Sequence, residues 1–143
     1  MSLDFGAVIP FVHHLGFTLE RFEGGESTLH FAPRPEHCNS FGVAHGGAVM
    51  TFLDVIMATA ARSANAGSGI VTIEMKTSFM AAARAEAGPL LAQGKLLHRT
   101  ATMAFTEGRV LDATGKLCAH ATGSASIPAS AMRANADASP HWT

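Results

Sequence analysis

One stretch constrains the fold of this chain more than any other. Residues 48–61 are almost all small or apolar and contain no proline. Alanine, methionine and leucine favour helix, and the stretch is longer than a typical strand, so the sequence predicts a helix here. A helix that is apolar on every side is normally buried on every side. The rest of the chain is therefore expected to wrap around it.

A carboxylate and a glycine pair make this predicted helix unusual. Asp54 stands in its middle, on the same face as Met50. An ionised carboxylate in apolar surroundings is costly unless it is paired, hydrogen-bonded or open to a polar cavity. Residues 45–47, His-Gly-Gly, lead into the first turn, where unpaired backbone N–H groups and the helix dipole favour negative charge. A helix N-terminus that can bind an anion thus lies about two helical turns from the Asp54 carboxylate, which indicates a functional site.

The segments around the helix read mainly as antiparallel strands. A short helix or turn is expected in residues 5–14, with Pro10 limiting its length. A glycine-centred turn at residues 23–26 predicts a hairpin. Residues 33–39 and 63–69 read as loops. The hairpin strands and four later strands are expected at residues 17–22, 27–32, 70–80, 90–99, 101–111 and 116–127.

The strand at residues 70–80 carries a clear alternation of apolar and polar side chains, which is typical of a half-buried strand. Strict alternation places Ile73, Met75 and Phe79 on the apolar face. It places Thr72 on the opposite, polar face, together with Glu74.

Length and composition predict a single folded domain, and the order of its expected helices and strands makes it α+β. The 143 residues fit one core, which we assign to residues 1–127, and residues 128–143 read as a flexible C-terminal tail. The chain is 48% hydrophobic and only 15% charged. Because this leaves more apolar surface than a small monomer shows to water, self-association is expected.

The sequence argues against several other partners and sites. A net charge of −1 does not indicate the excess of positive charge that is typical of nucleic-acid-binding proteins. The apolar helix is too short, and too interrupted by Asp54, to span a membrane, and no signal peptide is visible. Cys38 and Cys118 suggest no disulfide framework, so a cytoplasmic location is expected. The histidines lack zinc spacing and no G-x-S-x-G occurs, so neither a metal site nor a serine triad is expected.

Several of these motifs resemble those of a known family. Asn39, the turn at residues 45–47, and Asp54 nine residues after the histidine look like hotdog-fold acyl-CoA thioesterases. The similarity is greatest to the PaaI-type branch, which includes phenylacetate-pathway and hydroxybenzoyl-CoA thioesterases. Residues 71–83 and the turn at residues 112–116 fit the same branch. The resemblance implies a hotdog fold, an α+β fold in which an antiparallel sheet wraps around a long central helix.

What the resemblance implies about activity is hydrolysis of an acyl-CoA thioester, with no cofactor beyond the CoA of the substrate. The family forms homodimers, often homotetramers, with the active site at the dimer interface. The backbone N–H of Gly46 or Gly47 would polarise the thioester carbonyl, and Asp54 of the neighbouring subunit would act as general base or nucleophile. Thr72 falls where relatives have a hydroxyl residue that positions water. Asn39 matches an asparagine that orients the substrate or the water.

Each of these residues also has a structural explanation. Asp54 can be a carboxylate hydrogen-bonded to a loop or a subunit partner, although its burial is expected to raise its pKa toward that of a useful base. His45, which we assign to substrate binding, could be an acid, a base or a metal ligand, although a histidine before Gly-Gly more often packs and hydrogen-bonds to fix the turn. The two glycines can simply allow close packing, Asn39 can cap a turn, and Thr72 can be an ordinary strand residue.

The acyl group and the CoA contacts are less constrained. Phe41, Val43, Met50 and Phe52 would line a pocket suited to an aryl or medium-chain acyl group, although the same residues also suit a core. Each basic residue that could meet the CoA phosphates can also be a solvated surface charge; these residues are Lys76, Arg84, Lys95 and Arg99.

The sequence leaves two rival functions open. A hotdog fold also hosts hydratases and dehydratases of acyl thioesters, because a fold does not fix its chemistry. Their proline-rich motif before the helix is missing here. The second rival is a protein that binds acyl-CoA without turning it over.

Overall fold

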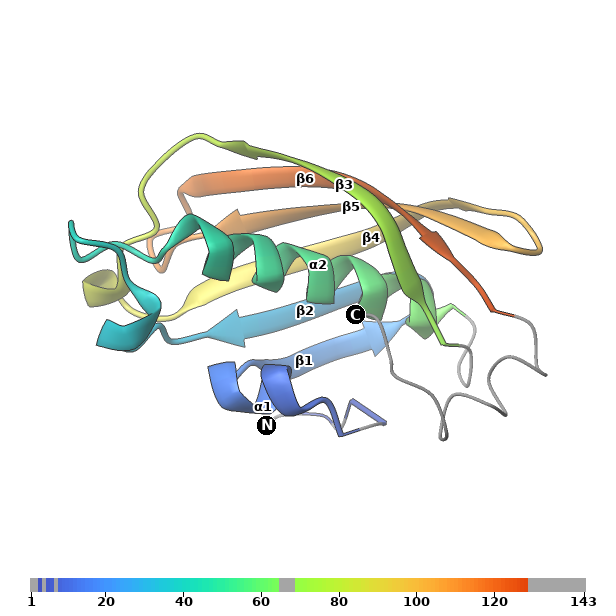
Figure 1. Ribbon diagram of the computed structural model, residues 1–143, viewed down its shortest axis with the longest axis horizontal. Helices are drawn as coiled ribbons and strands as arrows, with labels where there is room; N and C mark the ends of the chain where they lie inside the picture. Colours follow the sequence, from blue (N-terminus) through green and yellow to red (C-terminus); the bar gives the residue numbers. More distant parts are fainter. Residues whose placement is uncertain (1–2, 4, 7, 65–68, 129–143) are drawn as a thin grey trace.

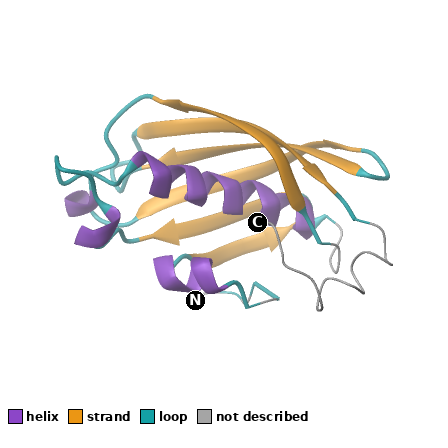
Figure 2. Ribbon diagram, viewed as in Figure 1, coloured by secondary structure: helices purple, strands orange, loops and turns teal. Residues whose placement is uncertain are grey.

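The long helix α2 (Gly46–Ser63) lies across one face of a six-stranded antiparallel sheet that curves around it (Figure 1). The computed structural model describes residues 3, 5, 6, 8–64 and 69–128. Figure 2 shows how few helical residues lie outside α2. They form α1 (Pro10–Leu15) and the short 3-10 helices η1 (Pro35–His37) and η2 (Ala85–Ala87).

The sheet places the strand that follows α2 at one edge. The strand order is β1-β2-β4-β5-β6-β3, so β1 and β3 are the edge strands. Every neighbouring pair is antiparallel. The strand bounds are β1 (Thr18–Glu23), β2 (Glu26–Phe31), β3 (Val71–Phe79), β4 (Leu90–Arg99), β5 (Met103–Leu111) and β6 (Leu117–Ser126).

The hydrophobic core fills the space between α2 and the sheet. The rings of Phe17, Phe31 and Phe52 meet there, with centroids 4.8–5.5 Å apart. Phe52, Leu53 and Ile56 of α2 have no exposed surface. Each such buried side chain contributes about 1.5–3 kcal/mol relative to an exposed one. The apolar helix is therefore buried by the sheet, as the sequence predicts.

The described elements confirm the α+β fold and refine its boundaries. The central helix begins with Gly46 instead of Ala48, and the predicted loop at residues 33–39 contains η1. Pro10 begins α1 instead of limiting it, because proline is well suited to the first helical position, where its missing N–H leaves no bond unmade. The predicted tail lies outside the described residues except for Pro128, as do residues 65–68 of the loop after α2.

One face assignment made from the alternating pattern is wrong. The pairing of β3 with β6 shifts between Thr72 and Glu74, so Ile73 is the extra residue of a β-bulge. Thr72 consequently lies opposite Ala125, a buried residue, and faces α2 with Met75 and Phe79. Ile73 is 57% exposed. A single inserted residue reverses the faces of a strand, and a strict two-residue period cannot show it.

Helix α2 lies close against the sheet where β4 and β5 carry glycines. Gly94 and Gly108 lie opposite each other in the two strands. A Cβ atom at Gly94 would lie 2.5 Å from the backbone oxygen of Ile56, a distance that real contacts do not allow. The same oxygen accepts a hydrogen bond of 2.9 Å from Ser27 Oγ of β2. The position of α2 on the sheet therefore depends on the missing side chain at residue 94.

Replacing Gly94 with alanine should destabilise the protein. The added methyl group has to push the helix backbone away from the sheet, which typically costs about 1–3 kcal/mol. Urea-induced unfolding of Gly94→Ala and of wild type measures this cost. Gly46→Ala is the matched control, because its Cβ would meet Phe79 at 3.6 Å, an ordinary contact distance. Equal unfolding midpoints for Gly94→Ala and wild type would contradict the close approach.

Candidate active site

Asp54 and Thr72 meet where α2 passes edge strand β3. The Thr72 hydroxyl donates a hydrogen bond of 2.6 Å to Asp54 Oδ1. The bulge at Ile73 makes this contact possible, because it turns Thr72 toward the helix. The structure thus brings together two of the predicted site residues, and it gives Asp54 a partner from the strand after its own helix.

The surroundings of Asp54 change its acidity. Burial raises the pKa of the Asp54 carboxyl above its ordinary value, and the hydrogen bond from Thr72 lowers it by a smaller amount. A carboxylate whose pKa lies closer to neutral is a stronger base toward water than an exposed aspartate. Burial therefore shifts the pKa of Asp54 in the direction that favours proton transfer from water.

The two glycines at the helix start are not equivalent. His45 is the N-cap residue of α2, and its ring Nδ1 accepts a hydrogen bond of 2.8 Å from the Gly47 N–H. The Gly46 N–H, by contrast, has no acceptor among the described residues. Of the two candidate donors, Gly46 is thus the one available to a ligand. The Phe79 ring packs beside it, close to where a Cβ of Gly46 would be.

Asn39 shapes the loop that precedes the helix. Its side-chain Oδ1 accepts hydrogen bonds from the N–H groups of Phe41, at 2.9 Å, and Val43, at 3.2 Å. Its backbone N–H donates to the Val43 carbonyl over 2.8 Å. The carbonyl oxygen of the side chain is therefore engaged in the turn, and the NH₂ group is the part of Asn39 that remains available to a substrate.

The candidate pocket residues divide into exposed and buried ones. Phe41 is 85% exposed and Met50 is 37% exposed, whereas Val43 is half-buried. Phe52 lies in the aromatic core and contacts no such surface. Within the described part of one chain, Phe41 and Met50 thus offer apolar surface at the helix start without forming an enclosed pocket.

A buried histidine that the sequence did not single out supports the helix start. The His37 ring accepts a hydrogen bond of 3.0 Å from the Arg34 N–H, and its backbone oxygen accepts one of 2.8 Å from the His45 N–H. Burial, and then the neighbouring Arg34 charge, lower the pKa of the His37 imidazole. A histidine within a polar loop carries no signal for this role in the sequence.

The two halves of the candidate site lie far apart within one chain. Gly46 and Asp54 are eight residues apart on α2, which corresponds to about 12 Å along the helix axis. The Asp54 carboxylate points toward β3, where Thr72 binds it. The free N–H at the helix start and the carboxylate are thus separate features of this chain.

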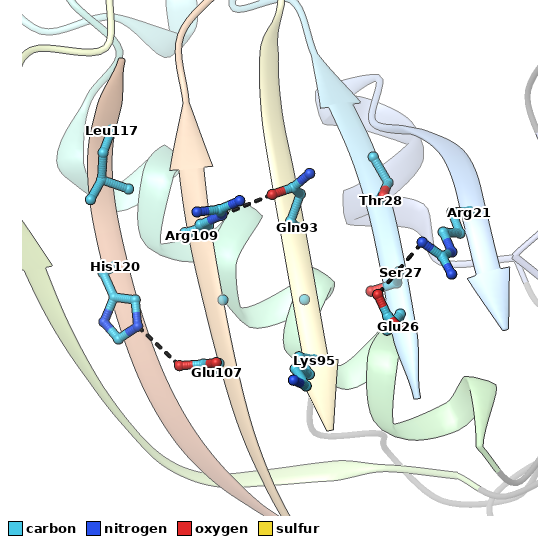
Figure 3. Close-up of a pocket in the computed structure, with 12 residues that line it drawn as sticks. Arg21, Glu26, Ser27, Thr28, Gln93, Lys95, Glu107, Arg109, Leu117 and His120 are labelled. Carbon is cyan, nitrogen blue, oxygen red and sulfur yellow. Dashed lines mark hydrogen bonds and ion pairs between the residues drawn. The ribbon is translucent and has the colours of Figure 1, made fainter. Parts of the chain in front are cut away.

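A larger hollow lies on the other face of the sheet. It has a volume of about 510 Å³ and is lined by charged and polar side chains of β1, β2, β4, β5 and β6 (Figure 3). Arg109 donates to Gln93 over 2.8 Å, and His120 lies 3.3 Å from Glu107. Lys95, one of the predicted phosphate contacts, lies here. Asp54 and Gly46 are not among its lining residues, so this hollow is a separate surface.

Two further features follow from the described residues. No group of three histidine, cysteine or acidic side chains among them is arranged to hold a metal ion. None of the helices in this part of the chain is long and apolar enough to cross a membrane.

Comparison with known proteins identifies the family. A sequence profile described as the Thioesterase superfamily matches residues 41–119, more than half of the chain, from the loop before α2 into β6. A protein of Saccharolobus solfataricus that carries the name of an esterase is 33% identical over 102 residues, which are 71% of each chain. This matched profile spans Gly46, Asp54 and Thr72.

Solved structures show the same fold. The PaaI protein of the E. coli phenylacetic acid degradation operon superimposes with a TM-score of 0.77 at 18% identity, covering 83% of this chain and 84% of that one. A Streptococcus mutans protein bound to acetyl-CoA gives 0.72 at 24% identity, covering 79% and 89%. Together with the profile match and the fold, these comparisons show that the chain belongs to the thioesterase superfamily.

Proposed function

We propose that this protein hydrolyses the thioester of an acyl-CoA to the free acid and CoA. The observation that carries the proposal is Asp54, a partly buried carboxylate of raised pKa held by Thr72, on a helix whose first N–H is free. Membership of the thioesterase superfamily and the acetyl-CoA bound to a protein of the same fold support it.

The proposed reaction uses two groups of the site. The Gly46 N–H donates to the thioester carbonyl oxygen and stabilises the negative charge that develops there. Asp54 accepts a proton from a water molecule whose oxygen attacks the carbonyl carbon. The C–S bond then breaks, and the CoA sulfur leaves and takes up a proton. In the alternative course its own carboxylate attacks, CoA leaves, and water then hydrolyses the acyl anhydride to the free acid and restores Asp54. Thr72 orients Asp54, and the NH₂ group of Asn39 is placed to orient the substrate or the water.

We infer that two copies of the chain build each site. A donor and a base that serve one thioester must both lie within about 3 Å of the reacting atoms. Gly46 and Asp54 of one chain are about 12 Å apart along α2, which is too far for both to act on one carbonyl. The Gly46 N–H of one protomer would therefore work with Asp54 of its partner.

The edge of the sheet supports a dimer. Strand β3 is an edge strand, and an unpaired edge with apolar side chains readily pairs with another chain. Ile73, Phe79 and Met80 of this edge are each more than half exposed. Pairing through β3 would cover these side chains and place the partner beside both Thr72 and Phe79. A homodimer is thus the minimal unit of the proposal, and two dimers joined as a tetramer are compatible with it.

Thiol release from a panel of acyl-CoAs tests the proposal. Phe41, Val43 and Met50 beside the helix start suit an aryl or medium-chain acyl group, so we expect turnover of phenylacetyl-, benzoyl- or medium-chain CoA. Free CoA detected with a thiol reagent, together with the free acid, supports hydrolysis. A hydroxyacyl or enoyl thioester without free thiol would show a hydratase or dehydratase instead. Binding without any product would show a non-catalytic acyl-CoA binder.

Arg84, one of the four candidate phosphate contacts, lies beside the loop that leads into α2. It pairs in an isolated bridge with Val43, next to the helix start, and its side chain is exposed and 3.7 Å from Glu86. Lys95 lines the hollow on the other face of the sheet. Arg84→Ala should therefore raise KM severalfold while kcat changes little, because the phosphates bind equally in ground and transition states.

Steady-state kinetics at two salt concentrations measure this effect. The KM difference between Arg84→Ala and wild type should shrink at high salt, since salt screens exposed charges. Lys95→Ala is the matched control and should leave KM unchanged. If Lys95→Ala raises KM and Arg84→Ala does not, the substrate approaches the other face of the sheet.

A further inference from the structure

A small cavity lies directly beside Asp54. Its volume is about 10 Å³, and residues of α2, β3, β5 and β6 line it. Asp54, Thr72 and Thr106 of β5 are among the residues that line it. A cavity of about this size can hold one water molecule where polar groups reach it. Four of the eight lining residues carry such groups: Asp54, Thr72, Thr106 and Ser124.

Thr106 is an unusual residue for its position. It is only 4% exposed and faces α2 between Ala104 and Gly108, in a row of small buried residues. Its hydroxyl donates to the Gly123 carbonyl across 3.4 Å, which is at the long limit for a hydrogen bond. A hydroxyl also has two acceptor lone pairs, and nothing among the described residues donates to them. A valine of the same shape would fill this place without an under-used polar group.

The cavity supplies the partners that a buried water needs. Buried waters typically make about three hydrogen bonds with polar groups that otherwise lack partners. The Asp54 carboxylate has lone pairs left for a water, since the Thr72 hydroxyl is its one side-chain donor among the described residues. The Thr106 and Thr72 oxygens both line the same space.

We propose that one water molecule bound in this cavity joins the Asp54 carboxylate to the Thr106 hydroxyl, and that Thr106 is a positioning residue for Asp54. The water donates one proton to the carboxylate and the other to Thr106 Oγ1, while the Thr106 O–H continues to point at the Gly123 carbonyl. Asp54 is then held from two sides, by Thr72 of the edge strand and through the water by the middle of the sheet. The catalytic importance of this arrangement rests on the proposed function, whereas the water bridge itself does not.

The water bridge should lower the pKa of Asp54. A hydrogen bond donated to a carboxylate stabilises its charged form and lowers its pKa. Loss of the water should therefore raise the pKa of Asp54 further. At a fixed pH near neutral, less of Asp54 would be ionised, and the acid limb of the rate profile would move to higher pH.

Carboxyl ¹³C NMR of Asp54 without substrate tests the bridge. Thr106→Val keeps the shape of the side chain and removes the hydroxyl, so we expect the Asp54 titration to move upward by about half a unit or more. Thr106→Ser keeps the hydroxyl and should titrate like wild type. Thr59→Val is the matched control, because Thr59 is also buried but donates to the Val55 carbonyl and does not line the cavity.

The outcomes separate this inference from the proposed function. An upward shift confined to Thr106→Val supports the bridge even if no acyl-CoA is cleaved. Unchanged titration in Thr106→Val, or the same shift in Thr106→Ser and Thr59→Val, overturns it. If Thr106→Val does not fold, a high-resolution crystal structure of the wild type decides: an ordered water between Asp54 and Thr106 supports the proposal, and a dry cavity overturns it. In an active enzyme, Thr106→Val should lower kcat at the pH values where Asp54 becomes protonated. KM should change little.

Discussion

Asp54→Asn should lower turnover of the preferred acyl-CoA by about a hundredfold or more, the loss that removal of a general base typically causes. Asparagine has nearly the same shape and still offers Oδ1 to the Thr72 hydroxyl, which donates to that atom in the wild type. It cannot accept a proton from water or attack a carbonyl. Single-turnover and steady-state thiol release measure the loss, and KM should change far less than kcat.

The same substitution should not weaken the fold. Because the folded-state pKa of Asp54 is raised, the native state binds the proton more tightly than the unfolded state. The stability associated with this carboxyl is therefore present at low pH and is lost as pH rises through the raised pKa. At neutral pH the asparagine variant, which has no charge to bury, should melt at the same temperature as wild type or higher. A variant that is inactive because it is unfolded would contradict this reading.

The pH dependence follows from the direction of the shift. If Asp54 is the base, kcat/KM of the wild type should fall as pH drops through its raised pKa, at higher pH than for an exposed aspartate. The residual activity of Asp54→Asn should lack this limb. Full activity in Asp54→Asn would assign the carboxylate a structural role only.

Gly46→Pro is the second substitution with a large expected effect. Proline removes the backbone N–H that we propose as oxyanion donor, and loss of one such donor typically lowers the rate by about 10²–10³. Gly46 is the first residue of α2, the position where proline best fits a helix. His45 before it has φ −59° and ψ 139°, the extended conformation that a following proline requires. The helix should therefore form normally in this variant.

Gly46→Ala controls for the added bulk. Its methyl group would lie 3.6 Å from the Phe79 ring, as an ordinary contact, and it keeps the N–H. We expect Gly46→Ala to retain most of its kcat and Gly46→Pro to lose it, with circular dichroism unchanged in both. Equal losses in the two variants would indicate that space beside Phe79 matters, and not the N–H.

The sequence predicts those parts of the fold that depend on local pattern. The apolar stretch at residues 48–61 predicts α2, and the strand-like segments predict strands close to their observed bounds. Both predictions work because the burial of a helix or a strand face decides which positions are apolar. The strand order and the edge position of β3 depend on contacts between distant segments, which no local pattern carries.

The candidate site shows the same division. Asp54 in an apolar helix is visible in the sequence as an energetic conflict, and a conflict of this kind often marks function. The contact with Thr72 is not visible, because the bulge at Ile73 reverses the face that alternation assigns to Thr72. Nor does the sequence distinguish Gly46 from Gly47, since the difference lies in the ring orientation of His45.

The central claim is that each site combines the helix start of one protomer with Asp54 of its partner, and a mixing experiment tests it most directly. Asp54→Asn and Gly46→Pro chains, each inactive alone, are co-expressed with different tags, and the dimers that carry both tags are isolated. Such a dimer holds one site with both groups intact and one site with neither. Random pairing should therefore restore roughly a quarter of wild-type activity in the mixture and about half in the purified mixed dimer. Mixed dimers that stay as inactive as their parents would contradict a shared site and place both groups within one chain.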